Sequence, residues 1–150
     1  SGLSKTIIIP GRPVRSARSD KIERICTPDR MHPELTHLQR IEELDALLEE
    51  SSTRPLLLFK HSLSCGTSYE ALDELIDHLN DERLPARYAM ITVQTHRELS
   101  TAVAKRLGVR HETPQALLIR DGRVVWTASH FRVTGGALET AIKTQIRDAQ

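Results

Sequence analysis

This 150-residue chain has two cysteines, Cys26 and Cys65, whose thiols are reactive or inert depending on their surroundings. They form no Cys-x-x-Cys pair, and neither has the Cys or His spacing of a zinc site, so no metal site is predicted. Two cysteines do not make a disulfide framework either. The chemistry to consider is therefore that of a free thiol, whose deprotonated form attacks disulfide sulfur.

The setting of Cys65 favours a reactive thiol over an inert, buried one. It follows the short apolar run Leu56–Phe59, which is typical of a buried strand, and it begins a segment with helical periodicity. The first N–H groups of a helix have no partner within it, and the helix dipole favours a negative charge there, such as a thiolate. We expect Lys60 and His61 to add positive potential, and Gly66 to let a bulky disulfide come close.

Ser68 stands three residues after Cys65, where a dithiol protein would have its second cysteine. A serine cannot form an internal disulfide, so any exchange at Cys65 must be monothiol and must end with attack by an outside thiol. The Ser68 hydroxyl is expected either to donate a hydrogen bond to the thiolate or to be an ordinary first-turn residue. Cys26 could act as a resolving thiol only if its segment folded back, and we interpret it as an unremarkable free thiol.

The apolar pattern from residue 34 onward alternates between helical and strand periodicity. Helices are predicted over 35–48, 69–79, 99–107 and 138–146. Strands are predicted over 56–59, 88–93, 116–119 and 124–126. The third helix is expected to start at a capping box of Thr95 and Glu98 and to end at Gly108, and Asp121-Gly122 indicates a hairpin turn.

This order, α-β-α-β-α-β-β-α, predicts an α/β protein with a mixed four-stranded sheet flanked by helices on both faces. Residues 34–150 form the predicted domain. Residues 1–33 carry seven basic and three acidic residues and show no apolar period, so we interpret them as an N-terminal extension, disordered by composition.

The overall composition argues against several classes of partner. The whole chain has 21 basic and 20 acidic residues and only 3% aromatic residues, which favours neither nucleic acid nor an anionic membrane. No apolar run approaches the roughly 20 residues of a membrane span, and no signal peptide is recognised. The expected location is the cytoplasm.

Several motifs between Glu34 and Ile146 together resemble the YtxJ-like family, the monothiol bacilliredoxins of the thioredoxin superfamily. They keep nearly the same spacing as in that family. The matching stretches are Phe59-Lys60-His61-Ser62, Cys65-x-x-Ser68, Val109-Arg110-His111-Glu112-Thr113-Pro114-Gln115, Asp121-Gly122-Arg123-Val124-Val125-Trp126 and Ser129-His130. The resemblance implies a thioredoxin-like fold.

The resemblance also implies an activity and a site. The activity is removal of bacillithiol, a low-molecular-weight thiol, from client proteins that carry it as a mixed disulfide. Cys65 would be the attacking thiol, Ser68 would fill the resolving position, and Pro114 would be a cis-proline facing the cysteine. The substrate-binding residues carried over are Thr113, Pro114, Gly66, Thr67 and His61. Bacillithiol is then a co-substrate, and no tightly bound cofactor is implied.

Two alternatives stay open. Cys65-Gly66-Thr67-Ser68 and Gly135-Gly136 also resemble glutaredoxins of the CGFS type, which use glutathione and can carry an iron–sulfur cluster between two subunits. A redox-inactive thioredoxin-fold adaptor is the other alternative. Among the histidines, His61, His111 and His130 are expected on loops near Cys65, where His61 is the candidate to tune the thiol or bind a carboxylate.

Overall fold

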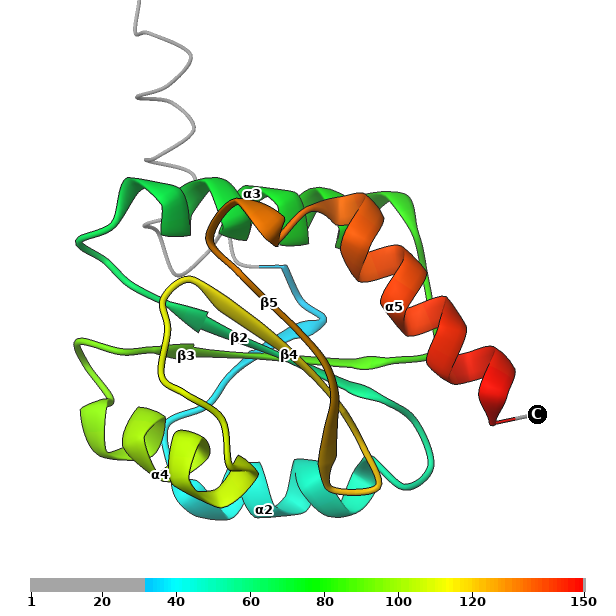
Figure 1. Cartoon of the computed structure of the whole chain (residues 1–150), viewed down its shortest axis with the longest axis horizontal. Helices are drawn as coiled ribbons and strands as arrows, with labels where there is room; N and C mark the ends of the chain where they lie inside the picture. The colour runs from blue at the N-terminus through cyan, green and yellow to red at the C-terminus, as the bar shows by residue number, and fades with distance from the viewer. Residues whose placement is uncertain (1–31, 150) are drawn as a thin grey trace, which may run out of the picture. The chain divides into compact units, whose positions relative to one another are not determined.

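The computed structural model describes residues 32–149 of the chain. The predicted N-terminal extension, apart from residues 32 and 33, and Cys26 therefore lie outside the described residues. In the described part the chain forms one mixed sheet with two helices on each face (Figure 1). No helix in this part is long and apolar enough to cross a membrane.

The sheet has five strands in the order β1-β3-β2-β4-β5. The strands are β1 (Leu35–His37), β2 (Leu56–His61), β3 (Arg87–Thr92), β4 (Gln115–Arg120) and β5 (Arg123–Ser129). Strands β1, β3 and β2 run parallel to one another, whereas β4 is antiparallel to both β2 and β5. The helices are α2 (Ile41–Glu50), α3 (Gly66–Asp81), α4 (Arg97–Leu107) and α5 (Gly135–Asp148), with a short 3-10 helix, η2 (His130–Arg132), before α5.

The fold class is confirmed, but the first element was predicted incorrectly. Leu35 to His37 form a strand that pairs with β3, and the first helix starts only at Ile41. Leu35 and Leu38 are both buried, so their spacing matched a helix face although the first lies in a strand and the second just after it. A strand of three residues is too short to show the alternation that identifies strands.

One face of the sheet packs against α2 and α4. Because successive strand residues point to opposite faces, Leu56 and Leu58 share this face with Ile91 of β3 and Leu117 of β4. The helices contribute the buried side chains of Leu44, Leu47, Leu99 and Val103. Helices α3 and α5 cover the opposite face (Figure 1). Leu57 and Phe59 alternate with Leu56 and Leu58 along β2, so they point toward this opposite face, and both are buried. The sheet is thus buried on both sides, and β2 is buried along its whole length.

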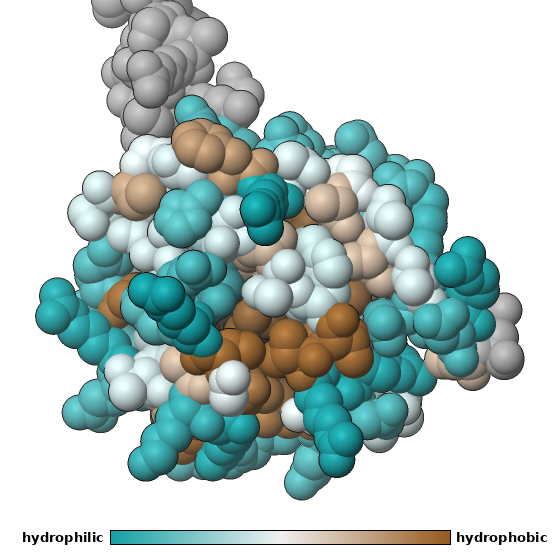
Figure 2. All heavy atoms as spheres, viewed as in Figure 1, coloured by the Kyte–Doolittle hydropathy of each residue, from teal (hydrophilic) through white to brown (hydrophobic). Residues whose placement is uncertain are grey.

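Strand β5 is the more open part of the sheet. It lies at the edge, and its residues alternate between exposed and half-buried up to Ala128. In the view of Figure 2, hydrophobic atoms gather below the middle, where β4 and β5 lie, within a largely hydrophilic surface. Val125 is one of the large hydrophobic side chains left exposed.

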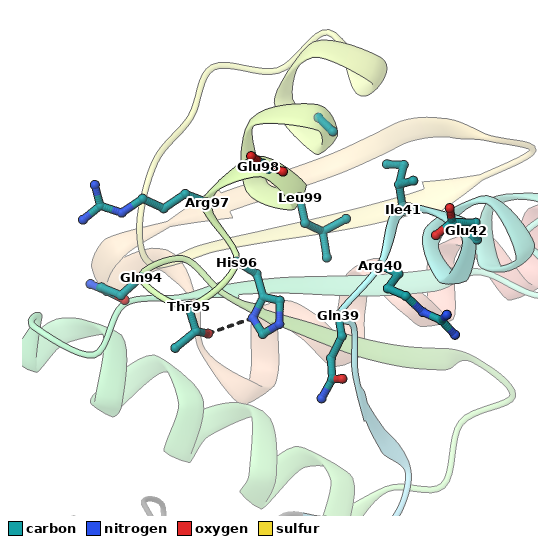
Figure 3. Close-up of a pocket in the computed structure, with 11 residues that line it drawn as sticks. Gln39, Arg40, Ile41, Glu42, Gln94, Thr95, His96, Arg97, Glu98 and Leu99 are labelled. Atoms are coloured by element: carbon teal, nitrogen blue, oxygen red, sulfur yellow. Dashed lines mark hydrogen bonds between the residues drawn. The ribbon is translucent and has the colours of Figure 1, made fainter.

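The ends of α4 differ in how well they were predicted. Gly108 ends the helix with a left-handed φ of 64°, as expected. The helix starts at Arg97 with His96 as its N-cap, and no side chain makes a capping hydrogen bond. The prediction of a capping box formed by Thr95 and Glu98 is therefore wrong. The Thr95 hydroxyl instead bonds to the carbonyl of Thr92 and to His96 Nδ1 (Figure 3).

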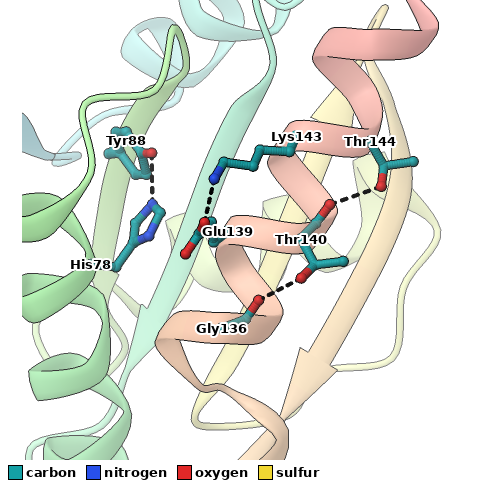
Figure 4. Close-up of polar contacts among 7 residues, drawn as sticks. All are labelled: His78, Tyr88, Gly136, Glu139, Thr140, Lys143 and Thr144. Atoms are coloured by element: carbon teal, nitrogen blue, oxygen red, sulfur yellow. Dashed lines mark hydrogen bonds and ion pairs between the residues drawn. The ribbon is translucent and has the colours of Figure 1, made fainter.

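Two polar contacts support the layer formed by α3 and α5. His78 Nε2 of α3 and the Tyr88 hydroxyl of β3 lie 2.9 Å apart, and burial raises the pKa of Tyr88 (Figure 4). At the start of α5, the Thr134 side chain accepts a hydrogen bond from the Ala137 N–H. The first contact gives hydrogen-bond partners to two buried side chains between α3 and the sheet, and the second gives a partner to an N–H group in the first turn of α5.

Candidate active site

Cys65 is the N-cap of α3, which confirms its predicted place between a strand and a helix. Its backbone is extended, and its carbonyl accepts hydrogen bonds from the N–H groups of Ser68 and Tyr69 at 3.1 and 3.4 Å. The thiol is free and partly exposed. The side chain therefore lies beside the first turn of the helix, where unpaired N–H groups stabilise negative charge.

Gln94, which follows β3, holds the loop that leads into Cys65. Its Oε1 accepts a hydrogen bond from the Leu63 N–H at 2.9 Å, and its Nε2 donates to the hydroxyls of Ser62 and Ser64 at 2.7 and 3.1 Å. Sequence reasoning missed this residue, because no local pattern connects it with a loop about 30 positions earlier. Gln94 also lines a hollow of about 780 Å³ between the starts of α2 and α4 (Figure 3).

Ser68 is fully buried, and its hydroxyl bonds to groups other than the Cys65 thiol, which was one of the two expectations. Its hydroxyl accepts a hydrogen bond from the Ser62 N–H at 2.9 Å and lies 2.8 Å from His61 Nδ1. Among the contacts of residues 32–149, the hydroxyl makes no hydrogen bond to the Cys65 thiol. Ser68 thus ties the first turn of α3, which follows Cys65, to the end of β2.

His61 differs from its prediction as an accessible loop residue. It is the last residue of β2, it is 2% exposed, and its ring packs edge-on against Tyr69. Burial, with a smaller contribution from the charge of His37, lowers the pKa of His61 to about 4. The side chain is therefore neutral at pH 7, adds no positive charge at Cys65, and contacts the site through Ser68.

This neutral, buried imidazole predicts a pH-dependent stability. An unfolded histidine has a pKa of about 6.5, so below that pH the unfolded chain binds a proton that the folded chain does not. The free energy of unfolding should fall as the pH drops from about 6.5 to 4, by about 2–3 kcal/mol from His61 alone. Denaturant unfolding at a series of pH values should show a shallower fall for His61→Asn, whose side-chain oxygen can still meet Ser68. Equal slopes in the two proteins would contradict this assignment.

Lys60 also lies away from Cys65. It shares the sheet face of Leu56 and Leu58, so its side chain points to the α2 and α4 side, and its Nζ lies 2.6 Å from His111 Nδ1. Of the two expected sources of positive charge, His61 is neutral at pH 7, and the Lys60 ammonium points to the α2 and α4 side, where it contacts His111.

The Thr113–Pro114 peptide bond is cis, as predicted. Strands β2 and β4 are antiparallel neighbours with Lys60 opposite Gln115, so Pro114 lies at the sheet end from which β2 leads to Cys65. The Pro114 carbonyl accepts a hydrogen bond from the His130 N–H at 3.1 Å. Among residues 32–149, the backbone N–H and C=O of Thr113 have no hydrogen-bond partner.

The residue after Cys65, Gly66, is exposed and has open space beside its Cα. A Cβ added at Gly66 would meet no atom within 4 Å, and Thr67 is half-buried in the first turn of α3. In the Gly135-Gly136 pair, the Gly135 N–H donates to Glu74 Oε2 at 2.8 Å. That N–H is therefore already bonded within the chain.

Thioredoxin-fold thiol–disulfide oxidoreductases are the class of protein to which this fold and this partly exposed thiol correspond. A solved structure described as an oxidoreductase with a thioredoxin fold is 29% identical, with a TM-score of 0.64 over 71% of this chain and 92% of that one. A mutant thioredoxin from Halobacterium salinarum is 25% identical, with a TM-score of 0.59 over 75% and 91% of the two chains. A poplar thioredoxin h mutant, 21% identical, has a TM-score of 0.62 over 78% and 85%, which supports the fold alone.

The family is shown by a second comparison. The family model described as monothiol bacilliredoxin BrxC matches residues 36–138, which is more than half of the chain. The chain therefore belongs to the monothiol bacilliredoxin family, as the sequence motifs predicted, and its general activity is thiol–disulfide exchange.

Proposed function

We propose that this protein removes a low-molecular-weight thiol, bacillithiol, from protein mixed disulfides, with Cys65 as the nucleophile. The observation that carries the proposal is the free thiol at the N-cap of α3, with the buried Ser68 hydroxyl where a second thiol would stand. The family match supports bacillithiol as the co-substrate. The partners proposed are client proteins that carry this thiol, in the cytoplasm.

The proposed cycle has two exchanges. The Cys65 thiolate attacks the sulfur of the bound bacillithiol, so a new disulfide forms at Cys65 and the client's sulfur leaves with the electron pair of the broken bond, as a thiolate. A second bacillithiol, as thiolate, then attacks the sulfur of the bacillithiol bound to Cys65. This releases bacillithiol disulfide and the Cys65 thiolate. Over the whole cycle the client sulfur is reduced to a thiolate and the second bacillithiol is oxidised, taking the client's place in the disulfide.

Mass spectrometry of the protein after incubation with bacillithiol disulfide, and separately with glutathione disulfide, tests this proposal. We expect the mass of one bacillithiol to be added at Cys65 and removed by added thiol. Preferential modification by glutathione would instead support the glutaredoxin-like alternative. No adduct from either disulfide, with Cys65 accessible to an alkylating reagent, would reject the enzymatic function and favour the adaptor.

A further inference from the structure

Lys60 is a buried cation without a carboxylate partner. Its side chain is fully buried in β2, and among residues 32–149 it takes part in no ion pair. Its one polar contact in this part is the 2.6 Å contact with His111 Nδ1. Burying an unpaired charge is costly, and truncating the cation to an apolar side chain would remove that cost. A gain in folding stability therefore does not explain why Lys60 is buried against His111, and a functional role has to be considered.

The geometry fixes the direction of this hydrogen bond. A lysine ammonium has three donors and no acceptor, so Lys60 donates and His111 Nδ1 accepts, which places the histidine proton on Nε2. Burial lowers the pKa of Lys60 to about 8, so the amine is still mostly protonated at pH 7. Burial, and then the charge of Lys60, lower the pKa of His111, which keeps the ring neutral and able to accept.

His111 lies in the segment between α4 and β4 that ends at the cis Thr113–Pro114 bond. A second contact ties the same segment to the sheet, since Gln115 Nε2 donates to the carbonyl of Arg110 at 3.0 Å. Gln115 is also the cross-strand neighbour of Lys60. Adjacent residues of β2 and β4 therefore bind the segment from beneath, at Arg110 and at His111.

We propose that Lys60 and His111 are positioning residues that hold the 110–114 segment so that the free backbone of Thr113 can pair with the polypeptide of a protein mixed disulfide. This inference rests on the proposed function. In this proposal the Lys60–His111 contact contributes to the binding of a protein substrate. It does not affect the reactivity of Cys65, because Lys60 points away from that residue. Substrates without a polypeptide to pair with Thr113 do not depend on it.

Three variants test the proposal. Lys60→Met keeps a long stem and removes the donor, His111→Leu removes the acceptor, and His111→Asn keeps an acceptor close to the position of Nδ1. Lys60→Met should fold, because methionine fits the space of a lysine stem. His111→Leu should fold because Lys60 can donate to another acceptor, the buried Gln115 Oε1, which has no hydrogen-bond partner in the described part. Thermal unfolding checks this for each variant.

The expected result separates protein substrates from small reagents. With a bacillithiolated protein, Lys60→Met and His111→Leu should raise KM about tenfold, the effect of losing one buried hydrogen bond. The kcat, and the rate at which iodoacetamide alkylates Cys65, should stay within about twofold of wild type. His111→Asn should match wild type throughout. An unchanged KM in the folded Lys60→Met and His111→Leu proteins, or an equal fall in every rate including alkylation, would overturn the proposal.

Hydrogen–deuterium exchange of the peptide that covers residues 109–113 keeps this inference separate from the proposed function. The exchange should be about tenfold faster in Lys60→Met and His111→Leu, and unchanged in His111→Asn. If wild type fails to reduce any bacillithiolated protein, the proposed function fails, and the exchange rates still decide whether the contact holds the segment. Equal exchange in all four proteins would overturn the positioning role whatever the activity.

Discussion

Cys65→Ser is expected to abolish reduction of protein mixed disulfides, with a loss of more than about 10³-fold. A serine hydroxyl is almost entirely protonated at neutral pH and does not displace a thiolate from a disulfide. The variant should fold normally, because the side chain is partly exposed and makes no cap hydrogen bond. The measurement is the steady-state rate with a bacillithiolated protein, together with the intact mass after exposure to bacillithiol disulfide.

Cys26→Ser is the matched control, since it removes the other thiol of the chain. It should keep the wild-type rate and the single adduct. Activity that persists in Cys65→Ser and disappears in Cys26→Ser would move the chemistry to Cys26 and contradict the assignment. A loss in both single variants would show instead that the two thiols act together and that the cycle is not monothiol.

Ser68→Cys is expected to convert the protein from a monothiol to a dithiol oxidoreductase. Residues 65 and 68 lie three apart across the first turn of α3, which is the Cys-x-x-Cys spacing of dithiol oxidoreductases. The introduced thiol should attack the mixed disulfide at Cys65 and release the small thiol without any outside thiol. Because the attack becomes intramolecular, release should be at least about 100-fold faster than in wild type at micromolar thiol.

The measurement is single-turnover release of the small thiol from the pre-formed Cys65 adduct, followed by the mass of the protein. The variant should end as an internal disulfide, two hydrogens lighter than its reduced form. Ser68→Ala is the control and should still wait for an outside thiol, although loss of the Ser62 and His61 contacts should lower its stability by about 1–3 kcal/mol. If Ser68→Cys also waits for an outside thiol, position 68 is not the resolving position.

Much of the site could be predicted because its key features are local in sequence. The place of Cys65 follows from an apolar strand and a helical period on either side of it, and each pattern is readable within a few residues. The cis Thr113–Pro114 bond before β4 was predictable once the motifs that resemble the bacilliredoxin family pointed to the thioredoxin fold. Gly108 and the Asp121-Gly122 turn, both with positive φ, carry their own conformational signal.

The features that were missed depend on distant partners. Gln94 bonds to a loop about 30 residues earlier, and His111 to a lysine that is 51 residues away in sequence. Neither contact leaves a pattern in the residues around it. The state of His61 was misjudged for the same reason, since its charge depends on burial under α3 rather than on its nearness to Cys65. Strand β1 has only three residues and owes its existence to the backbone of β3.

The register shift between β4 and β5 has a consequence for how this protein behaves in concentrated solution. Leu118 pairs with Trp126 and Ile119 with Val124, so Val125 is an extra residue in the edge strand. A bulge of this kind twists and interrupts the row of backbone donors and acceptors that an edge offers to another chain. The outer edge of β5 is therefore a poor template for the addition of a strand from another molecule. This protects the protein against aggregation through β5, the strand that carries the exposed Val125 side chain.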